Sequence, residues 1–410
     1  MAQGHKPASP HHLGKTPRQG KEEGRQGAGR PPRGRPDFTR FDLDRSPRHG
    51  ICKRMSEHRP RVAIILFNLG GPDAPEAVRP FLENLFLDPA IVRLPKLLRW
   101  PLGKFIAARR TKAASENYAI LGGKSPLLEL TIAQGEALQA ALAPEMEARC
   151  FVAMRYWHPF AEATAREVKA WGADEAILLP LYPQFSTTTS GSSIDDWKAA
   201  CAKVGLDLPS KTLCCWHSDE GFARATAALV QASYDKARAE LPAEVPLRIL
   251  FSAHGLPESI VKRGDPYQWQ VERSVAAVVG QLDIPGLDHS VCYQSRVTPQ
   301  KWIGPSTEEA LEHAAKEKVA VLVCPIAFVS EHSETLVELD VEYQELAHKL
   351  GIPGYFRVPA QNSDAGFIGA LAGLVRRVRA GNRTLCSFAG GRQCPKQHGD
   401  CPHARARNAA

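Results

Sequence analysis

The sequence predicts an α/β fold of two Rossmann-like, doubly wound domains with parallel sheets and a central cleft between them. Short apolar runs rich in β-branched residues alternate with helical patterns along the chain, which is typical of parallel sheets with right-handed crossovers. Several of these runs end in a loop that carries glycine, hydroxyl or aromatic residues. The order of strand, loop and helix occurs on both sides of about residue 215, which indicates two domains.

The composition limits which classes of protein this chain can belong to. A chain of 410 residues is long enough for two domains, and 43% hydrophobic and 23% charged residues are ordinary for a globular protein. No run of eighteen apolar residues exists, so no membrane-spanning segment is expected. Residues 1–59 hold 14 Lys and Arg against 6 Asp and Glu, which accounts for the net charge of +8. The rest of the chain is nearly neutral, so no nucleic-acid partner is expected for the folded body.

Residues 1–59 form a basic N-terminal extension rich in Gly, Pro and Arg, without apolar periodicity, and we expect it to be disordered. Three interpretations are open: a start codon placed too far upstream, with Met55 as the true start; a polybasic arm that touches anionic lipid or nucleic acid; and an organellar transit peptide. The lack of an amphipathic stripe favours the first. The ten scattered cysteines predict reduced thiols and a cytoplasmic location.

The first domain is expected over residues 60–215, and it opens with strand 62–67 and the loop Asn68–Asp73. The paired glycines of this loop let the backbone approach a ligand closely, and a plain strand-to-helix turn is the alternative. The loop lacks G-x-G-x-x-G and the Walker lysine, which disfavours dinucleotides and triphosphates. The other expected elements of this domain are helices 76–116, 127–142, 161–171 and 193–203, and strands 151–154, 175–181 and 211–216.

Two stretches of the first domain indicate contacts outside the chain. Arg155, Tyr156 and Trp157 set a cation beside two aromatic rings, which suits a flat, anionic, conjugated ligand because the guanidinium pairs with a carboxylate and the rings stack. A core cluster is the alternative. Residues 93–112 are basic and apolar, and they predict either a lip that dips into a bilayer surface or a segment that packs on the core.

The second domain is expected over residues 216–354, and the chain after it is divided into two further segments. Residues 355–385 are predicted to return to the first domain as a strand and a helix, and residues 386–410 form a tail that contains cysteine. The expected elements are helices 219–240, 266–282, 306–316, 335–350 and 363–379, and strands 248–251, 291–296, 319–324 and 355–358.

The loops after two strands of the second domain carry imidazole and carboxylate groups. The strand Val319–Cys324 ends at Pro325, and Ser330 is expected to cap a helix that begins with Glu331 and His332. Helical spacing puts Glu331, Glu334 and Glu338 on one ridge. If the strand before His254 lies in the same parallel sheet, its carboxyl end brings His254 opposite His332 and Glu334.

This set of side chains suits metal insertion into a planar macrocycle. Imidazole and carboxylate bind Fe²⁺, and weak, open coordination suits a metal that is handed over. A macrocycle that takes up a divalent metal loses two N–H protons, so it needs a base, and His254 is the natural candidate. Aromatic rings suited to a planar macrocycle are supplied by Tyr118, Tyr156, Trp302 and Phe328.

Across residues 61–380 the chain resembles the ferrochelatase family, whose members insert ferrous iron into a porphyrin in the last step of haem synthesis. One motif alone is weak, but the set in this order is specific. The matching motifs are NLGGPD (68–73), LGGKSP (121–126), MRYWHP (154–159), LYPQFSTTTSGSS (181–193), SAHGLP (252–257), CYQSRVTPQKWIGPSTEEAL (292–311) and PIAFVSEHSETLVELD (325–340).

The resemblance implies a class II chelatase-like fold and a division of roles among the site residues. His254, Glu334 and His332 are expected to be catalytic, and the metal path is expected to use His254, Glu334 and Glu338. The basic, apolar residues 93–112 would be the membrane-facing lip. The residues expected to bind the porphyrin are Leu69, Tyr118, Arg155, Tyr156, Ser186, Trp302 and Phe328.

The tail is also similar to that of some bacterial relatives, which bind a [2Fe–2S] cluster with C-terminal cysteines. Cys386, Cys394 and Cys401 are the expected ligands here, one short of four. Thr187 stands where some animal members carry a ligating cysteine. The fourth ligand stays open among a cysteine of the body, His398 or His403, and none.

The function expected from the resemblance is insertion of Fe²⁺ into protoporphyrin IX, with both as substrates, by a cytoplasmic enzyme in peripheral contact with a membrane. A chelatase for coproporphyrin or cobalt, and a porphyrin or haem carrier without turnover, are the alternatives. Both a monomer and a homodimer are compatible with the sequence.

Overall fold

The computed structural model describes residues 59–295 and 300–408, and these residues belong to one compact unit. The predictions made for residues 1–58, including the disordered extension and Met55, lie outside the described residues. Within the described ranges, no helix combines the length and the apolar character that crossing a bilayer requires.

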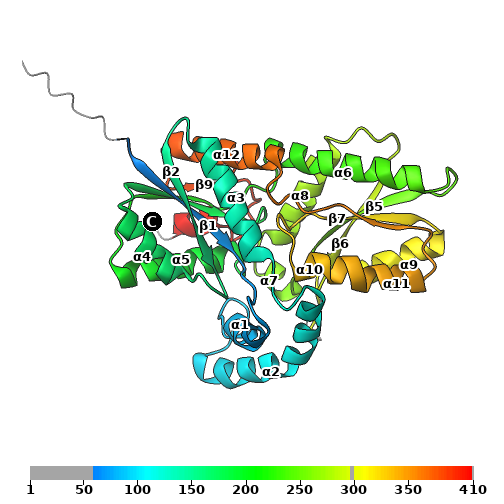
Figure 1. Ribbon diagram of the computed structural model, residues 1–410, viewed down its shortest axis with the longest axis horizontal. Helices are drawn as coiled ribbons and strands as arrows, with labels where there is room; N and C mark the ends of the chain where they lie inside the picture. The colour runs from blue at the N-terminus through cyan, green and yellow to red at the C-terminus, as the bar shows by residue number, and fades with distance from the viewer. Residues whose placement is uncertain (1–58, 296–299, 409–410) are drawn as a thin grey trace, which may run out of the picture. The chain divides into compact units, whose positions relative to one another are not determined.

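The first sheet contains five parallel strands in the order β2, β1, β3, β4 and β9 (Figure 1). In β1, Val62 to Leu66 have no exposed surface, because helices cover both faces of the sheet. The bounds are β1 (Arg61–Asn68), β2 (Glu147–Met154), β3 (Glu175–Pro180), β4 (Ser210–Leu213) and β9 (Leu385–Cys386).

The second sheet contains four parallel strands in the order β6, β5, β7 and β8. The chain enters at β5 and turns to β6 on one side and β7 on the other, so β5 lies at the topological switch point where doubly wound sheets bind ligands. The bounds are β5 (Leu247–His254), β6 (Asp288–Gln294), β7 (Ala320–Pro325) and β8 (Tyr355–Arg357).

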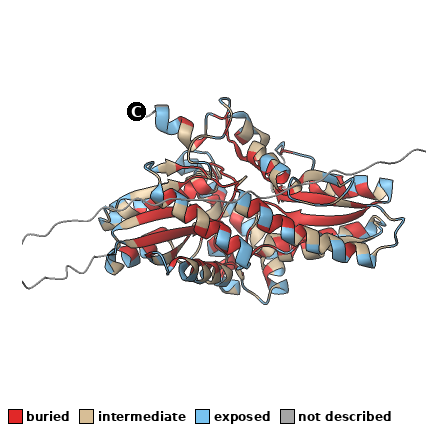
Figure 2. Ribbon diagram, turned by 90° about the horizontal axis from the view of Figure 1, so that it is seen from above, coloured by how far each residue is buried: buried red, intermediate tan, exposed pale blue. Residues whose placement is uncertain are grey.

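Helices cover both faces of each sheet, and the buried strands form continuous bands between them (Figure 2). In the first sheet α3 and α12 cover one face, and α4 and α5 the other. In the second sheet α6 and α8 cover one face, and α9 and α11 the other. The bounds are α3 (Leu127–Leu142), α4 (Ala161–Trp171), α5 (Ser190–Val204), α6 (Glu220–Glu240), α8 (Tyr267–Val279), α9 (Thr307–Glu317), α11 (Tyr343–Lys349) and α12 (Ala365–Ala380).

One apolar core joins the two sheets. Helices α6 and α12 are in contact where one meets the other along the top of the view in Figure 1, and their inward side chains belong to one cluster with apolar residues of both sheets. The remaining helices are η1 (Pro75–Ala77), α1 (Val78–Phe86), α2 (Lys96–Ile120), α7 (Glu258–Lys262), α10 (Ser333–Leu336), the π-helix η2 (Glu338–Glu342) and α13 (Pro402–Asn408).

Residues 76–116, which the sequence predicts to be helical, contain a break. The chain leaves the helix after Phe86 and re-enters it at Lys96, because Pro89 and Pro95 interrupt the pattern. The two parts of this segment differ in burial. Phe81 and Phe86 of α1 pack in a core cluster, whereas the first half of α2 exposes large apolar side chains.

The segment 355–385 is also divided between the sheets. Strand β8 pairs with β7 in the second sheet, while α12 packs on the first sheet and β9 pairs with β4. The short loop before α12 carries the chain across, so only the helix and β9 make the expected return to the first sheet.

Candidate active site

His254 is the last residue of β5, and its ring is oriented by the backbone around it. The Nδ1 atom lies 2.6 Å from the carbonyl oxygen of Gly255, so Nδ1 carries the proton and donates it to that carbonyl. In the neutral ring Nε2 is then the unprotonated nitrogen. The hydroxyl of Tyr267 donates to the His254 carbonyl at 3.0 Å, which fixes the backbone at this position.

Glu334 lies between two imidazoles. Its Oε1 atom is 3.7 Å from His254 Nε2, and its Oε2 atom is 3.6 Å from His332 Nε2. Burial alone would raise the pKa of Glu334, but the two imidazoles lower it to about 2. The Glu334 side chain keeps 26% of its surface exposed and that of His254 keeps 36%. The pair is therefore an ionised carboxylate beside an imidazole that solvent and small molecules reach.

Glu338 is the second carboxylate of the site, and three neighbours hold it. Gln294 donates to its Oε2 atom at 2.9 Å, Ser295 donates to the same oxygen, and Tyr343 donates to Oε1 at 3.1 Å. Burial and the negative charge of Glu334 raise the pKa of Glu338. Glu334 and Glu338 thus differ in their affinity for a proton, although both are glutamates on the same short stretch of chain.

The predicted ridge of Glu331, Glu334 and Glu338 is wrong at its first member. The helix begins at Ser333 with His332 as its N-cap, two residues later than expected, and Ser330 donates instead to Gln134. Glu331 pairs with Arg357 at 2.8 Å, which directs it away from Glu334.

The helical register also changes after Glu334. The backbone widens into the π-helix η2 from Glu338 to Glu342, so the carboxylates do not follow a single 3.6-residue repeat. π-turns of this kind occur often at functional sites.

Aromatic side chains surround the imidazole and carboxylate groups. The Phe328 ring lies 4.5 Å from that of His332, centre to centre. Ser333 donates to the Tyr118 hydroxyl at 3.5 Å. Trp302 packs against Gly255, where an added Cβ would come within 3.2 Å of the indole. Leu69 is half-buried against the cluster that contains Tyr118. Phe328, Tyr118 and Trp302 therefore contact site residues or their direct neighbours in the chain, and Leu69 packs near Tyr118.

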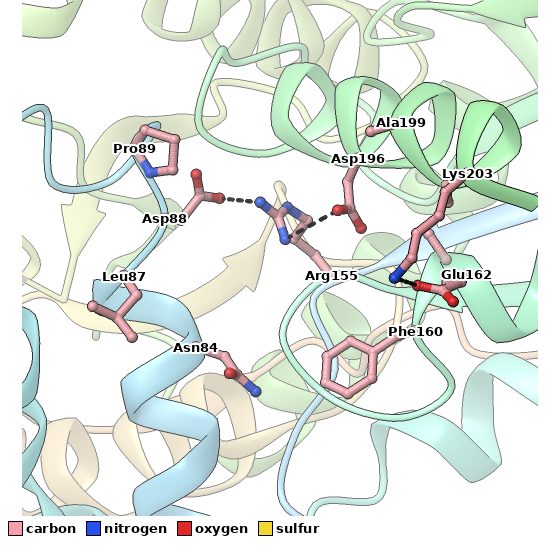
Figure 3. A pocket seen from close by; sticks show the side chains of 12 residues that line it. Asn84, Leu87, Asp88, Pro89, Arg155, Phe160, Glu162, Asp196, Ala199 and Lys203 are labelled. Carbon is pink, nitrogen blue, oxygen red and sulfur yellow. Dashed lines mark hydrogen bonds and ion pairs between the residues drawn. The ribbon is translucent and has the colours of Figure 1, made fainter. Parts of the chain in front are cut away.

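Arg155 has internal partners rather than a free guanidinium. It pairs with Asp88 at 2.9 Å and approaches Asp196 at 3.8 Å, and Tyr156 donates to Asp88 at 2.8 Å with 1% of its surface exposed. The expected ion pair between Arg155 and a ligand carboxylate is therefore already satisfied by Asp88. Asp88, Arg155 and Asp196 line a pocket of about 400 Å³ (Figure 3), and His254 and Glu334 do not line it.

Ser186 is likewise buried, with 1% of its surface exposed. Its hydroxyl donates to Asp265 at 3.1 Å, and Thr187 donates to the same carboxylate oxygen from its backbone N–H and its hydroxyl. Ser186 thus serves as a hydrogen-bond donor to a buried acid. The structure does not bring Ser186 to the group around Glu334.

Several residues that position the site were missed in the sequence. Gln294, Ser295 and Tyr343 hold Glu338, and Tyr182 lies within electrostatic range of both Arg155 and Glu334. Ser295 adopts a φ of +65°, which a non-glycine residue rarely does. The signal available for three of them was membership of a motif, CYQSRVTPQKWIGPSTEEAL for Gln294 and Ser295 and LYPQFSTTTSGSS for Tyr182. Tyr343 lies outside every quoted motif.

The three tail cysteines do not share one site. Cys394 and Cys401 are buried and pack in one small cluster with Ala404. Cys386 lies in β9, where strand alternation turns its side chain into the core shared by α12 and the first sheet. Among the described residues, no three His, Cys, Asp or Glu side chains converge on a point that would hold a metal ion.

A base, an ionised carboxylate and a ring of aromatic side chains at the switch point of a parallel sheet define an enzyme of the metal-chelatase class. The comparisons with known proteins give the family. The family model for ferrochelatase matches residues 61–379. The chain belongs to the ferrochelatase family.

Individual relatives cover most of the chain. The ferrochelatase of Phenylobacterium zucineum is 51% identical over 344 residues, which is 83% of this chain and 97% of the relative. That of Caulobacter vibrioides is 50% identical over 345 residues, with the same coverage. Among solved structures, SirB from Bacillus subtilis with Fe³⁺ matches at a TM-score of 0.45 and 12% identity, covering 78% of this chain and 96% of SirB.

Proposed function

We propose that this chain inserts Fe²⁺ into protoporphyrin IX, forms protohaem and releases two protons, in the last step of haem biosynthesis. The observation that carries the proposal is the grouping of His254, Glu334 and His332, with the Glu334 oxygens 3.7 and 3.6 Å from the two imidazoles. Membership of the ferrochelatase family supports iron and porphyrin as the substrate classes.

The proton steps are assigned to His254 and the two glutamates. Because Nδ1 of His254 donates to Gly255, Nε2 is the atom that accepts a pyrrole proton. The Glu334 carboxylate stabilises the imidazolium that forms, since opposite charges at this separation attract strongly in a partly desolvated site. Glu338, whose pKa is raised, takes the proton onward more readily than Glu334 does.

Fe²⁺ is assigned to the same acidic face. Carboxylate oxygens and imidazole nitrogens are suitable ligands for Fe²⁺. Of the three proposed ligands, Glu338 is fixed by hydrogen bonds, whereas Glu334 and His254 are partly exposed to solvent. The aromatic groups of Tyr118, Trp302 and Phe328 supply flat apolar contacts for a macrocycle. Arg155 and Tyr156 are assigned a structural role, because both bind Asp88.

A peripheral contact with a membrane surface from the cytoplasmic side is part of the proposal. In α2, Leu97 is 88% exposed and Phe105 is 63% exposed, and Lys96, Arg99 and Lys104 alternate with them. Apolar side chains among cations suit the headgroup region of an anionic bilayer. The iron–sulfur cluster expected at Cys386, Cys394 and Cys401 is kept as a proposal without a catalytic step, although Cys386 packs in a different cluster from the other two.

An anaerobic insertion assay tests this function. Purified protein is mixed with Fe²⁺ and protoporphyrin, and loss of porphyrin fluorescence and formation of the haem absorption band are followed. Parallel runs use coproporphyrin and Co²⁺. Faster turnover with Fe²⁺ and protoporphyrin supports the proposal. Faster turnover with coproporphyrin or Co²⁺ favours a different chelatase, and tight porphyrin binding without turnover indicates a carrier.

A further inference from the structure

The stretch of chain that carries the two glutamates of the site is held from outside by the short edge strand β8. Tyr355 and Arg357 are alternate residues of this strand, so their side chains leave the same face of the sheet. Phe356, between them, packs in the core on the other face, whereas Tyr355 packs with apolar residues of α9 and α11. Strand β8 therefore presents one phenol and one guanidinium to the face that carries the site glutamates.

Arg357 binds this stretch at two points. Its Nε and Nη2 atoms donate to the two carboxylate oxygens of Asp340, with Nη2 2.7 Å from Oδ2, and its Nη1 atom donates to Glu331 Oε1 at 2.8 Å. The Tyr355 hydroxyl donates to the Leu339 carbonyl at 2.6 Å. Only 14% of the Arg357 side chain is exposed. Two parallel hydrogen bonds from a guanidinium to one carboxylate fix direction as well as distance.

The π-helix η2 is the part of this stretch that Arg357 contacts through Asp340. The N–H of Glu342 donates to the Val337 carbonyl at 3.0 Å, and that of Tyr343 donates to the Glu338 carbonyl. Both bonds join residues five apart, one more than in an α-helix. π-turns are rare, so contacts with the rest of the fold are needed to hold one in place. Arg357 supplies such a contact at the middle of the turn.

The π-turn decides which side chains face each other at the site. Residues three or four apart lie on one face of an α-helix, whereas Tyr343 and Glu338 are five apart. The Tyr343 hydroxyl nevertheless lies 3.1 Å from Glu338 Oε1, because the wider turn brings the two side chains together. The same backbone as an α-helix would rotate Tyr343 away from Glu338.

We propose that Arg357 is a positioning residue for metal insertion. By binding Asp340 and Glu331 at once, it holds the π-turn in place, and the turn sets the direction of Glu338 and its hydrogen bond with Tyr343. Arg357 acts through these residues and does not itself contact the reacting groups. The inference rests on the proposed function, because that function assigns Glu338 to the iron and proton steps.

The first test compares Arg357→Lys with Arg248→Lys, since lysine keeps the charge and loses the planar fork. Arg248 is the matched control. It also pairs with two carboxylates, Asp288 and Glu317, each at 2.8 Å, and 16% of its side chain is exposed, but it lies near the start of β5, whose last residue is His254. We expect turnover of Arg357→Lys to fall by about ten-fold with an unchanged KM for porphyrin. Arg248→Lys should keep the wild-type rate.

A double variant separates positioning of Glu338 from an independent effect on the rate. Tyr343→Phe removes the hydrogen bond to Glu338 that the π-turn makes possible. If Arg357 acts through the turn, Arg357→Lys combined with Tyr343→Phe loses about ten-fold, as either change alone does. Independent effects would multiply to about a hundred-fold.

Hydrogen exchange gives a readout that does not need turnover. The amides of Glu342 and Tyr343, which close the π-turn, should exchange faster in Arg357→Lys than in wild type, while exchange in β1 stays unchanged. Arg248→Lys should leave the turn amides as they are. Asp340→Asn removes the charge on the other side of the same contact and should give the same local change, which keeps the test available where Arg357→Lys does not fold.

Four results would overturn the inference. These are turnover of Arg357→Lys equal to that of Arg248→Lys, losses that multiply in the double variant, unchanged exchange of the turn amides in Arg357→Lys and Asp340→Asn, and faster exchange spread evenly over the chain. Failure of the proposed function is distinguishable from all four. Wild-type protein without turnover on any porphyrin would remove the function, while exchange of the turn amides would still report whether Arg357 holds the π-turn.

Discussion

The Nε2 atom of His254 lies 3.7 Å from the Oε1 atom of Glu334, although one residue ends β5 and the other stands in α10, beyond β7. The two strands are neighbours in register, with Ser252 opposite Pro325. Parallel pairing therefore brings the residues after each strand to the same edge. The sheet, rather than a local motif, creates the pair of base and carboxylate.

Replacement of Glu334 by Gln keeps the size of the side chain and removes its charge. The imidazolium of His254 then has no anion 3.7 Å away, so we expect Fe²⁺ insertion to fall by about a hundred-fold. Glu342→Gln is the matched control, because this exposed glutamate of η2 bonds only to Asn117 at the surface among the contacts described. Anaerobic initial rates check the prediction, and equal rates for the two variants would refute it.

The ion pair of Glu331 and Arg357 should make stability depend on pH. Burial alone would raise the pKa of Glu331, but Arg357 lowers it below the ordinary value. A lowered carboxyl pKa stabilises the folded state above the unfolded pKa of roughly 4.3, and this stabilisation is lost as pH falls through the folded pKa. Glu331→Gln should cost about 2 kcal/mol at pH 7 and less near pH 3.

Urea unfolding at both pH values measures this difference. Glu345→Gln removes an exposed partner of Lys349 and should change the free energy of unfolding by less than about 0.5 kcal/mol. A gap between wild type and Glu331→Gln that is constant from pH 7 to pH 3 would contradict the argument.

Tyr343→Phe should remove one hydrogen bond to Glu338 and leave porphyrin binding intact. The Tyr343 hydroxyl lies 3.1 Å from Glu338 Oε1, and loss of one hydrogen bond to a charged group costs about 1.5 kcal/mol, or about ten-fold in rate. We expect the turnover number to fall and the KM for porphyrin to stay the same. Tyr234→Phe, on α6, is the control. A changed KM with unchanged turnover would place Tyr343 in porphyrin binding instead.

The exposed part of α2 should bind anionic vesicles. Leu97 and Phe105 are its most exposed large apolar side chains, and replacing both by Asp should weaken co-sedimentation by about a hundred-fold, since each buried side chain contributes about 1.5 kcal/mol or more. Ile132→Asp removes an exposed apolar residue of α3 and should have no effect. Equal binding of the two variants would exclude α2 as the contact.

The fold followed from the sequence because buried parallel strands leave an unambiguous apolar run. Every predicted strand is present in the structure. The ninth strand, Leu385–Cys386, was missed because two residues carry no periodicity, and its partner β4 decides that it forms. For the same reason the sequence did not reveal that Cys386 faces the core.

The sequence predicted the types of residue in the site better than it predicted which side chains pair with one another. His254, His332 and Glu334 could be grouped because each follows a strand of one sheet. Glu331 was expected to lie in the same group of site residues, but it pairs with Arg357 of β8. A local sequence pattern does not predict an ion pair between residues so far apart in the chain. Arg155 shows the same limit, since a sequence gives the charge of a guanidinium and not that Asp88 neutralises it.

The most direct test of the account is the rate of Fe²⁺ insertion by His254→Ala, measured anaerobically beside porphyrin affinity from fluorescence titration. The control is His348→Ala, which removes an exposed imidazole at the end of α11. The account predicts a loss of about 10²- to 10⁴-fold in turnover, with porphyrin affinity nearly unchanged. Turnover of His254→Ala equal to that of the control would contradict it.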